Sequence, residues 1–163
     1  MVKLELVGVS QYDKDGTYAV LLRDETRILP IMVGLPEASA IHIVLMGQMP
    51  PRPLTHDLIC NLLAGLRGRL QSVIIYKLEN GTFFAHLNIE QLSPSGQVEQ
   101  VLRVDSRPSD GIAIAIRTKC PIYAAEEVMQ QAGQDAASLL SSDDDDDDEA
   151  NEHIEGEDSE FDE

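Results

Sequence analysis

The sequence predicts an α+β domain built on a mixed, mainly antiparallel sheet. Three observations support this prediction. Residues 1–33 contain three apolar segments separated by short turns, two later segments carry apolar side chains at helical spacing, and Asn80-Gly81 joins two strand-like segments. Because hairpins and separate helices are typical of α+β folds, we expect a sheet opened by a three-stranded meander and about three main helices.

The opening strands are predicted from alternation and turn chemistry. Apolar and polar side chains alternate over residues 2–9, which indicates a half-buried strand. Asp15-Gly16 is a strong hairpin signal, and residues 18–23 and 27–33 form the second and third strands. Pro30 lies within the third strand and lacks an N–H for the ladder. We therefore expect this strand to be bulged or to lie at an edge of the sheet.

Two helices follow the meander. Pro36 suits the first turn of a helix that runs to about Met46, and Glu37 lies where the helix dipole favours a carboxylate. A segment rich in proline then excludes helix up to Pro53. The next helix has five apolar side chains at helical spacing, which we expect to form its core face: Leu58, Ile59, Leu62, Leu63 and Leu66.

A hairpin is predicted over residues 70–78 and 82–89. Its turn, Asn80-Gly81, suits a type I′ geometry because both central positions need positive φ. Alternation places His86 on the face opposite Phe83, where it points to solvent, an interface or a cleft. Since no motif surrounds His86, we interpret it as a structural residue.

The remaining elements are shorter. Residues 98–104 predict a sixth strand and residues 112–117 a third helix. A short final strand at 120–123 and a short helix at 125–131 complete the predicted fold.

The charge of −17 is concentrated at one end of the chain. Of the 29 acidic residues, 14 lie between Asp143 and Glu163, where there is no Lys or Arg, so residues 1–142 hold 15 acidic residues against all 12 basic ones. A segment with so little apolar content does not bury enough surface to order itself. We therefore expect one domain over 1–132 and a disordered polyacidic tail over 133–163, which serves mainly to keep the protein soluble.

The composition also argues against several classes of protein. The nearly neutral body shows no cluster of Lys and Arg, which counts against tight, sequence-independent binding to a nucleic-acid backbone. Cys60 and Cys120 have no spacing typical of a zinc site. The N-terminus is unlike a signal peptide, and no apolar run approaches the roughly 20 residues of a membrane span. We expect a cytoplasmic protein with no membrane segment.

Two motifs concentrate the polar chemistry of the body. Arg52-Pro53-Leu54-Thr55-His56-Asp57 precedes the second helix, and Asp105-Ser106-Arg107-Pro108-Ser109-Asp110 precedes the third. A purely structural interpretation is that Thr55 and Ser109 are N-caps, with Asp57 and Asp110 complementing the helix dipoles. Starting a helix requires neither the two arginines nor His56.

Brought together, the two motifs predict a phosphate-facing site. The arginines are suited to grip a phosphate, and carboxylates from Asp57, Asp105 and Asp110 are suited to hold Mg²⁺ or Mn²⁺. The imidazole of His56 is suited to act as general base or acid. The alternative is that Arg52 and Arg107 pair with the aspartates in a buried network that only fixes the fold. Spacing alone leaves both interpretations open.

These stretches resemble the signature motifs of the bifunctional nuclease domain family. The resemblance lies in the run from Pro51 to Leu58, the run from Ser106 to Ala115, Ile28 to Gly34 with Glu37-Ala38, and Cys120-Pro121-Ile122-Tyr123. It implies a compact α/β domain that self-associates, often as a dimer. It also implies nuclease activity on both DNA and RNA, as described for plant members. Gly111 departs from the Ala usual in the family and is expected to cost some stability at a helix start.

The sequence therefore predicts a homodimeric nuclease that hydrolyses phosphodiester bonds of DNA and RNA with the help of a divalent metal. The alternative is a non-enzymatic homodimeric module that binds a protein partner or a small anionic ligand. The predicted site assigns catalysis to His56, Asp57, Arg52, Arg107 and Asp110, substrate binding to Thr55, Ser109, Arg52 and Arg107, and metal binding to Asp57, Asp105 and Asp110.

Overall fold

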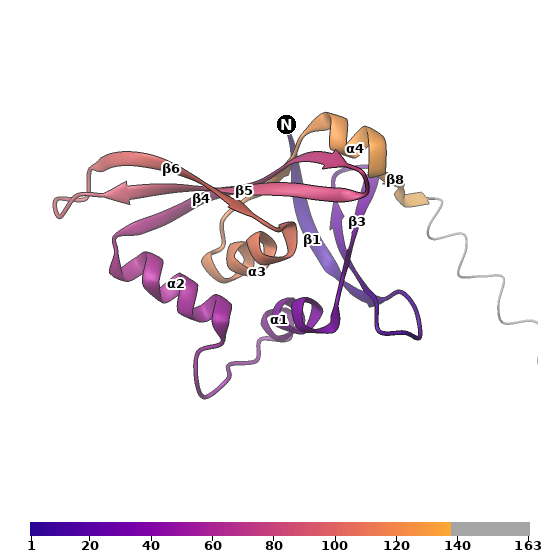
Figure 1. Cartoon of the computed structure of the whole chain (residues 1–163), viewed down its shortest axis with the longest axis horizontal. Helices are drawn as coiled ribbons and strands as arrows, with labels where there is room; N and C mark the ends of the chain where they lie inside the picture. The colour runs from indigo at the N-terminus through magenta and orange to yellow at the C-terminus, as the bar shows by residue number, and fades with distance from the viewer. Residues whose placement is uncertain (138–163) are drawn as a thin grey trace, which may run out of the picture.

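The computed structural model describes residues 1–137 and confirms the α+β class (Figure 1). In the described part of the chain, eight strands form one sheet and four helices pack against it. The elements are β1 (Val2–Gln11), β2 (Tyr18–Arg23), β3 (Arg27–Val33), α1 (Leu35–Leu45), α2 (Thr55–Gly65), β4 (Gly68–Glu79), β5 (Thr82–Leu92), β6 (Val98–Ser106), α3 (Pro108–Thr118), β7 (Ile122–Ala124), α4 (Glu126–Ala132) and β8 (Gln134–Asp135).

The strand order is β6-β5-β4-β7-β1-β2-β3-β8, and neighbouring strands are antiparallel except for the pair of β4 and β7. The short strand β7 joins two hairpin ribbons, because it pairs with β4 on one side and with β1 on the other. The predicted opening meander is confirmed as β1, β2 and β3. Local turn chemistry starts both ribbons. Gly16 adopts positive φ between β1 and β2, and Asn80 and Gly81 adopt positive φ between β4 and β5.

Pro30 lies where β3 has a partner on one side. It is opposite Leu21 of β2, whereas β8 pairs only with Arg27 and Ile28 at the start of β3. Because no second strand pairs with β3 beside Pro30, this residue lies at an edge position, where the absence of an N–H donor is tolerated.

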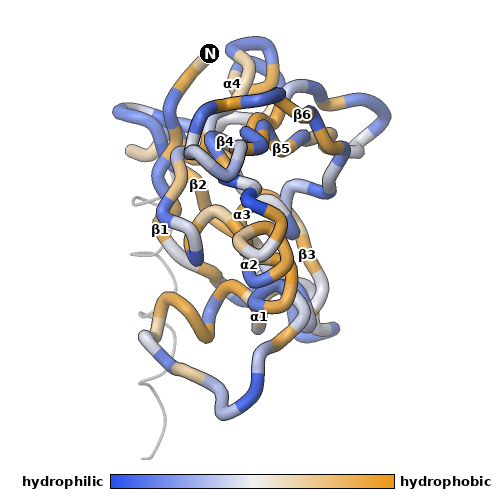
Figure 2. The backbone as a smooth tube through the Cα atoms, turned by 90° about the vertical axis from the view of Figure 1, so that its left-hand side faces the viewer, coloured by the Kyte–Doolittle hydropathy of each residue, from blue (hydrophilic) through white to orange (hydrophobic). Residues whose placement is uncertain are grey.

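Helix α3 is central in the helical layer. It packs between α1 and α2 and against β4 and β5, while α4 packs against β4 and β3 (Figure 1). Hydrophobic side chains from the sheet and from α3 form one continuous core, including Ile75, Leu87, Ile112 and Ile114. The apolar colouring in Figure 2 likewise concentrates on the segments around α3 and on the strands that face it.

Gly111 is needed for the close approach of α3 to the sheet. A Cβ atom at this position would lie 2.7 Å from Cγ1 of Val73, which is fully buried on β4. Real side chains do not approach so closely, so Val73 fills the space that an alanine methyl would need. The glycine is thus matched to a particular neighbour, a reason that the sequence does not reveal.

Helix α2 differs from the prediction in its orientation. Leu58, Leu62 and Leu66 are 50%, 55% and 66% exposed, whereas Ile59 and Leu63 pack against the core. The helix has apolar side chains around more than one face, so spacing could not show which of them would be buried. The three exposed leucines form a stripe at positions i, i+4 and i+8.

Regular secondary structure also extends past residue 132. Strand β8 pairs Gln134 and Asp135 with β3, within the segment that the sequence assigns to the tail. The predicted polyacidic tail otherwise lies outside the described residues. Within residues 1–137, no helix is both long and apolar enough to cross a membrane.

Candidate functional site at the starts of three helices

Helices α1, α2 and α3 begin in the same way. The residues that precede them are Gly34, Leu54 and Arg107, which are extended and make no side-chain cap. The third residue of each helix is a carboxylate: Glu37, Asp57 and Asp110. Each helix thus places a negative charge next to its positive N-terminal end.

The predicted N-caps Thr55 and Ser109 are wrong by one and two positions. Thr55 is the first residue of α2 and is exposed, and Ser109 is the second residue of α3 and is buried. Helix α3 starts earlier than expected because Pro108 fits the first helical position. In α2 the cap function passes to Asp57, whose Oδ2 accepts the backbone N–H of Leu54 at 2.8 Å.

The core of the site is a chain of contacts that links all three helices through charge. Nε2 of His56 lies 3.0 Å from Oδ1 of Asp110. Nε and Nη2 of Arg107 donate to the same carboxylate at 2.7 and 3.1 Å, and Nη1 of Arg107 donates to Glu37 at 3.0 Å. We call these four residues the His56 cluster. It joins α1, α2 and α3 at their first turns.

Hydrogen bonds between oppositely charged groups shift the pKa values of Asp110 and Arg107 in this cluster. Burial tends to raise the pKa of Asp110, but hydrogen bonds from Arg107 and His56 outweigh it and hold that pKa below the ordinary value of 3.8. Hydrogen bonds to Asp110 and Glu37 raise the pKa of Arg107 above its ordinary value. At neutral pH the cluster therefore contains two carboxylates and a guanidinium around one imidazole.

A second set of contacts lies behind the first. Nε of Arg117 donates to Oδ1 of Asp57 at 2.6 Å, and its Nη1 donates to the backbone carbonyls of Ala40 and Ala113 at 3.0 and 2.8 Å. The Arg117 side chain is 8% exposed. The hydrogen bond from Arg117, followed by that from the Leu54 N–H, lowers the pKa of Asp57. Arg117 thus ties the three helices together from inside.

Two predicted site residues lie apart from the His56 cluster. Arg52 is exposed in the segment between α1 and α2 and makes no hydrogen bond or ion pair with any residue in 1–137. Asp105 pairs with His86 across β5 and β6 and lines another pocket with Tyr76 and Arg103. Because side chains alternate along β6, Asp105 faces away from α3, whereas the chain turns at Arg107 to enter it.

A pocket of about 340 Å³ lies beside the His56 cluster. It is lined by the end of β3, the β4–β5 turn and the first residues of α1 and α3, including Glu37, Phe83, Arg107 and Ser109. The Arg107 side chain lines this pocket and is 64% exposed, although it is paired with Asp110 and Glu37. Backbone N–H groups at two helix starts and an exposed guanidinium favour an anion such as a phosphate here.

The predicted metal ligands do not fit a divalent cation in this arrangement. Asp57 is engaged by Arg117, Asp110 is engaged by Arg107 and His56, and Asp105 lies on another face of the sheet. Throughout residues 1–137, no group of three or more His, Cys, Asp or Glu side chains is placed to hold a metal ion.

The prediction from sequence missed Glu37 and Arg117 as site residues. Both had a signal. Glu37 occupies the same helical position as Asp57 and Asp110, and Arg117 lies seven residues after Asp110, on the same face of α3. What the sequence did not reveal was that Arg117 reaches across to α2.

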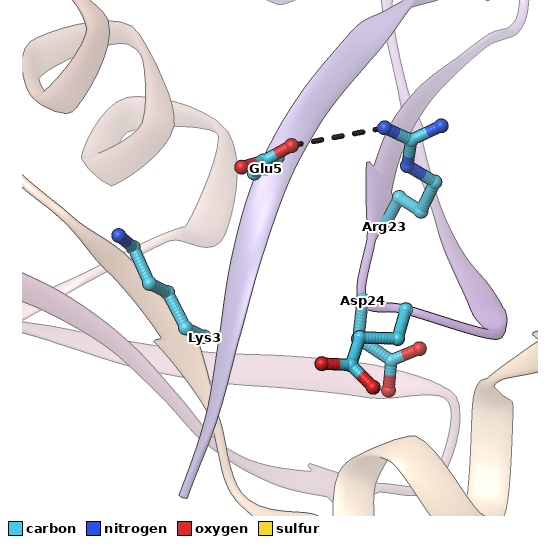
Figure 3. A pocket seen from close by; sticks show the side chains of 5 residues that line it. Lys3, Glu5, Arg23 and Asp24 are labelled. Atoms are coloured by element: carbon cyan, nitrogen blue, oxygen red, sulfur yellow. Dashed lines mark ion pairs between the residues drawn. The ribbon is translucent and has the colours of Figure 1, made fainter.

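A further pocket lies elsewhere and shares no residue with the His56 cluster. It measures about 550 Å³ and is lined by Lys3 and Glu5 of β1 with Arg23, Asp24 and Glu25 at the end of β2 (Figure 3). Its charges are mixed, and Arg23 lies 3.7 Å from Glu5, with both side chains largely exposed. This surface contains no imidazole and no helix start, so it is a weaker candidate.

Fold and site together define a small α+β domain with an anion-facing cluster of Arg, His and carboxylate side chains. The chain belongs to the bifunctional nuclease domain family, whose model matches residues 20–137. Two uncharacterized proteins from two strains of Mycobacterium tuberculosis are each 41% identical to it over 135 residues, which is 82% of this chain and 77% of theirs. The family predicted from the motifs is thereby confirmed.

Proposed function

We propose that this protein is a nuclease that hydrolyses phosphodiester bonds of DNA and RNA at the His56 cluster. The supporting observation is that an imidazole, a carboxylate and an exposed guanidinium are joined beside a pocket that two helix starts line. The membership of the chain in the bifunctional nuclease domain family agrees with this chemistry.

Arg107 is the proposed phosphate ligand. Its guanidinium is held by Asp110 and Glu37 while the side chain remains 64% exposed, so the N–H groups that these carboxylates do not engage are available to a substrate. Ser109 lines the same pocket, where its hydroxyl and its backbone N–H are neutral donors in the first turn of α3. Binding a phosphate here would cost little side-chain entropy, because the ion pairs with Asp110 and Glu37 already order Arg107.

His56 and Asp110 are the proposed proton-transfer pair. Asp110 holds Nε2 of His56, which leaves Nδ1 to accept a proton from an attacking water. The water oxygen forms a bond to phosphorus, the bond from phosphorus to the leaving oxygen breaks, and the imidazolium returns a proton to that oxygen. Asp110 stabilises the imidazolium in between, as the carboxylate does in other acid–base dyads.

Asp57 and Arg117 are positioning residues in this proposal. Their ion pair fixes the start of α2 against α3, and His56 is the neighbour of Asp57 in that turn. Arg52 is free to move toward a bound nucleic acid. Assistance by Mg²⁺ or Mn²⁺ stays a prediction, as does a cytoplasmic location, and no step above depends on a metal.

The test is an assay of purified protein on labelled single-stranded and duplex DNA and RNA, in EDTA, Mg²⁺ or Mn²⁺. His56→Ala should lower kcat by roughly 10²- to 10⁴-fold, the usual contribution of a general base. Arg107→Gln should act mainly through KM. His42→Ala, which changes an exposed histidine of α1, is the matched control. Activity that persists in both His56→Ala and Asp110→Asn would come from a contaminant and would overturn the proposal.

A second candidate, a homodimeric binding module, is supported by the exposed apolar stripe of α2. Leu58, Leu62 and Leu66 lie outside the core, and the edge strand β6 exposes Leu102 and Val104 on the face that it shares with Leu87. Surfaces of this kind are typical of self-association. Sedimentation of Leu62→Lys against wild type tests the dimer: a dimer that becomes a monomer supports it, and a monomeric wild type contradicts it.

A further inference from the structure

A second pocket lies on the face of the β4–β5–β6 ribbon that α3 does not cover. It measures about 460 Å³ and is lined by Tyr76, His86, Arg103 and Asp105. The proposed catalytic cluster uses none of these four side chains. Three neighbouring strands supply them, since Tyr76 is on β4, His86 on β5, and Arg103 and Asp105 on β6.

His86 is the unexplained residue of this pocket. The residue is 9% exposed, yet Nε2 of its ring is buried without a hydrogen-bond partner among residues 1–137. Buried polar atoms in folded proteins are nearly always hydrogen-bonded. Burial lowers the pKa of His86, and the nearby Arg103 lowers it further against the opposing effect of Asp105. The ring is therefore neutral at pH 7, with one nitrogen that donates and one that accepts.

Aromatic rings form the rest of the surface. The ring of Tyr76 lies 5.2 Å from that of His86 and 6.4 Å from that of Phe84, between centroids. Tyr76 is 42% exposed, so part of its ring is open to a ligand. Nζ of Lys77 lies 5.7 Å from the Phe84 ring centroid. The pocket thus combines an exposed ring, an unpaired imidazole nitrogen, a guanidinium and a carboxylate.

We propose that this pocket binds an unpaired base of a single-stranded nucleic acid. This proposal rests on the proposed nuclease function and extends it to a second contact with substrate. The base stacks on Tyr76, its polar edge meets Asp105, and Arg103 contacts the adjoining phosphate or the ring face. Nε2 of His86 is buried, so the base reaches it only when the groups that cover it shift. Aromatic side chains on a sheet with polar groups beside them recognise single-stranded bases by this combination of stacking and hydrogen bonds.

The charges favour a base over a phosphate as the principal ligand. Arg103 is offset by Asp105 on the same strand, and Lys77 is paired with Glu79 at 2.8 Å. A surface so close to neutral gives little purely electrostatic affinity for a nucleic-acid backbone. Binding must then come from stacking and hydrogen bonds, which a base supplies. In a duplex the bases are paired and stacked, so a single strand fits better.

The two sites are joined through consecutive residues. On β5, Phe83 lines the pocket beside the His56 cluster, and its neighbour Phe84 contacts Tyr76 on the opposite face. On β6, Asp105 lines the base pocket, and Arg107 lies two residues further along. Because β6 is the edge of the sheet, a single nucleic-acid strand that passes around this edge reaches both sites. The base pocket would thus anchor the strand whose phosphate Arg107 holds.

The test compares oligothymidylate with an abasic oligomer of the same length, by fluorescence anisotropy in EDTA. Wild type should bind the base-bearing strand more tightly. Tyr76→Leu should weaken that binding by roughly 5- to 100-fold and bring it to the level of the abasic oligomer, as expected for the loss of one stacked base. Tyr76→Phe should retain the preference. Tyr12→Leu, which removes another exposed tyrosine, is the matched control.

A nucleoside separates failure of this inference from failure of the nuclease proposal. Adenosine has no phosphate, so its binding does not depend on Arg107. Added to wild type, it should shift the ring resonances of Tyr76 and His86 and leave those of His56 unchanged. Arg107→Gln should weaken binding of both oligomers equally. Equal affinity of wild type for the base-bearing and abasic oligomers, or adenosine shifts absent from Tyr76 and His86, would overturn the base pocket even where cleavage is observed.

Discussion

His56 and Asp110 connect two helices through one short contact, with Nε2 of the imidazole 3.0 Å from the carboxylate Oδ1. The same carboxylate accepts two hydrogen bonds from Arg107. Asp110 therefore lies between two donors, and neutralising it removes the attraction to both of them.

The first prediction follows from that arrangement. Asp110→Asn should lower the free energy of unfolding by about 1–2 kcal/mol, the usual cost of losing hydrogen bonds to charged partners at a partly exposed site. Urea denaturation at pH 7 measures this change. A stability equal to or above that of wild type would show that the contacts of Asp110 do not support the fold.

A larger loss is expected at Arg117. This buried side chain bonds Asp57 and two backbone carbonyls, so Arg117→Gln leaves all three acceptors without a charged donor. We expect a loss of roughly 3 kcal/mol, at the low end for breaking a buried pair, because Asp57 retains some contact with water. Arg23→Gln removes an exposed pair with Glu5 (Figure 3) and should cost under about 0.5 kcal/mol in the same urea titration. Similar costs for the two variants would contradict the structural role of Arg117.

Acid should remove stability in the range where the paired carboxylates titrate. The folded-state pKa values of Asp24, Asp57 and Asp110 are lowered from 3.8, mainly by hydrogen bonds from arginines and backbone N–H groups acting against burial. Their contribution is complete above about pH 4 and is lost as the pH falls through the folded pKa values. Thermal unfolding from pH 7 to pH 2 should show this loss, and Asp110→Asn should make it smaller. An identical profile for the variant would refute the assignment.

Protonation of His86 should make the stability of the fold depend on pH in a higher range than the carboxylates do. Its folded-state pKa lies below the ordinary 6.5, chiefly through burial, so the unfolded chain binds a proton more readily. Stability should therefore fall as the pH drops below 6.5 toward the folded pKa. His86→Leu should abolish this fall and raise stability at pH 7 by roughly 1 kcal/mol, because a buried nitrogen without a partner is removed. An unchanged slope between pH 6.5 and pH 5 in the variant would contradict the prediction.

Gly111 and Val73 should show coupled effects. Gly111→Ala alone should destabilise by about 1–3 kcal/mol, because the new methyl group would overlap Val73. In a Val73→Ala background the same change should be neutral or stabilise by up to about 1 kcal/mol, through its better helix propensity. A double-mutant cycle by urea denaturation measures the coupling. Additive effects would mean that the helix shifts to accommodate the methyl group.

Local chemistry made much of the fold predictable. The turns at Gly16 and Gly81 are determined by residues next to each other in sequence, so both hairpins were expected. The N-terminal positions of α2 and α3 were less accurate, because Pro108 and Asp57 took over the roles assigned to Ser109 and Thr55.

Contacts between distant segments were the part that the sequence did not determine. Ala40 and Arg117 are 77 positions apart in the sequence, and Asp57 and Arg117 are 60 positions apart, so these groups meet only after the helices pack. The outward orientation of Leu58 and Leu62 likewise depends on how α2 lies on α3, which spacing does not specify. For the same reason Asp105 was grouped with Asp110, although a strand ends and a helix begins between them.

The pairing of β5 with β6 sets the spacing between the His56 cluster and the base pocket. Next to the turn over residues 93–97 the ladder is irregular, with a register shift between Gln91 and Leu92, whereas Ala85 and Ser106 are paired in register at the other end. A change in the length of the turn over residues 93–97 is therefore absorbed at the irregular end. Shortening the segment between Asp105 and Arg107 is not absorbed in this way, since one residue fewer would reverse the face of one side chain relative to the other. Relatives of different loop length should thus keep this two-residue spacing.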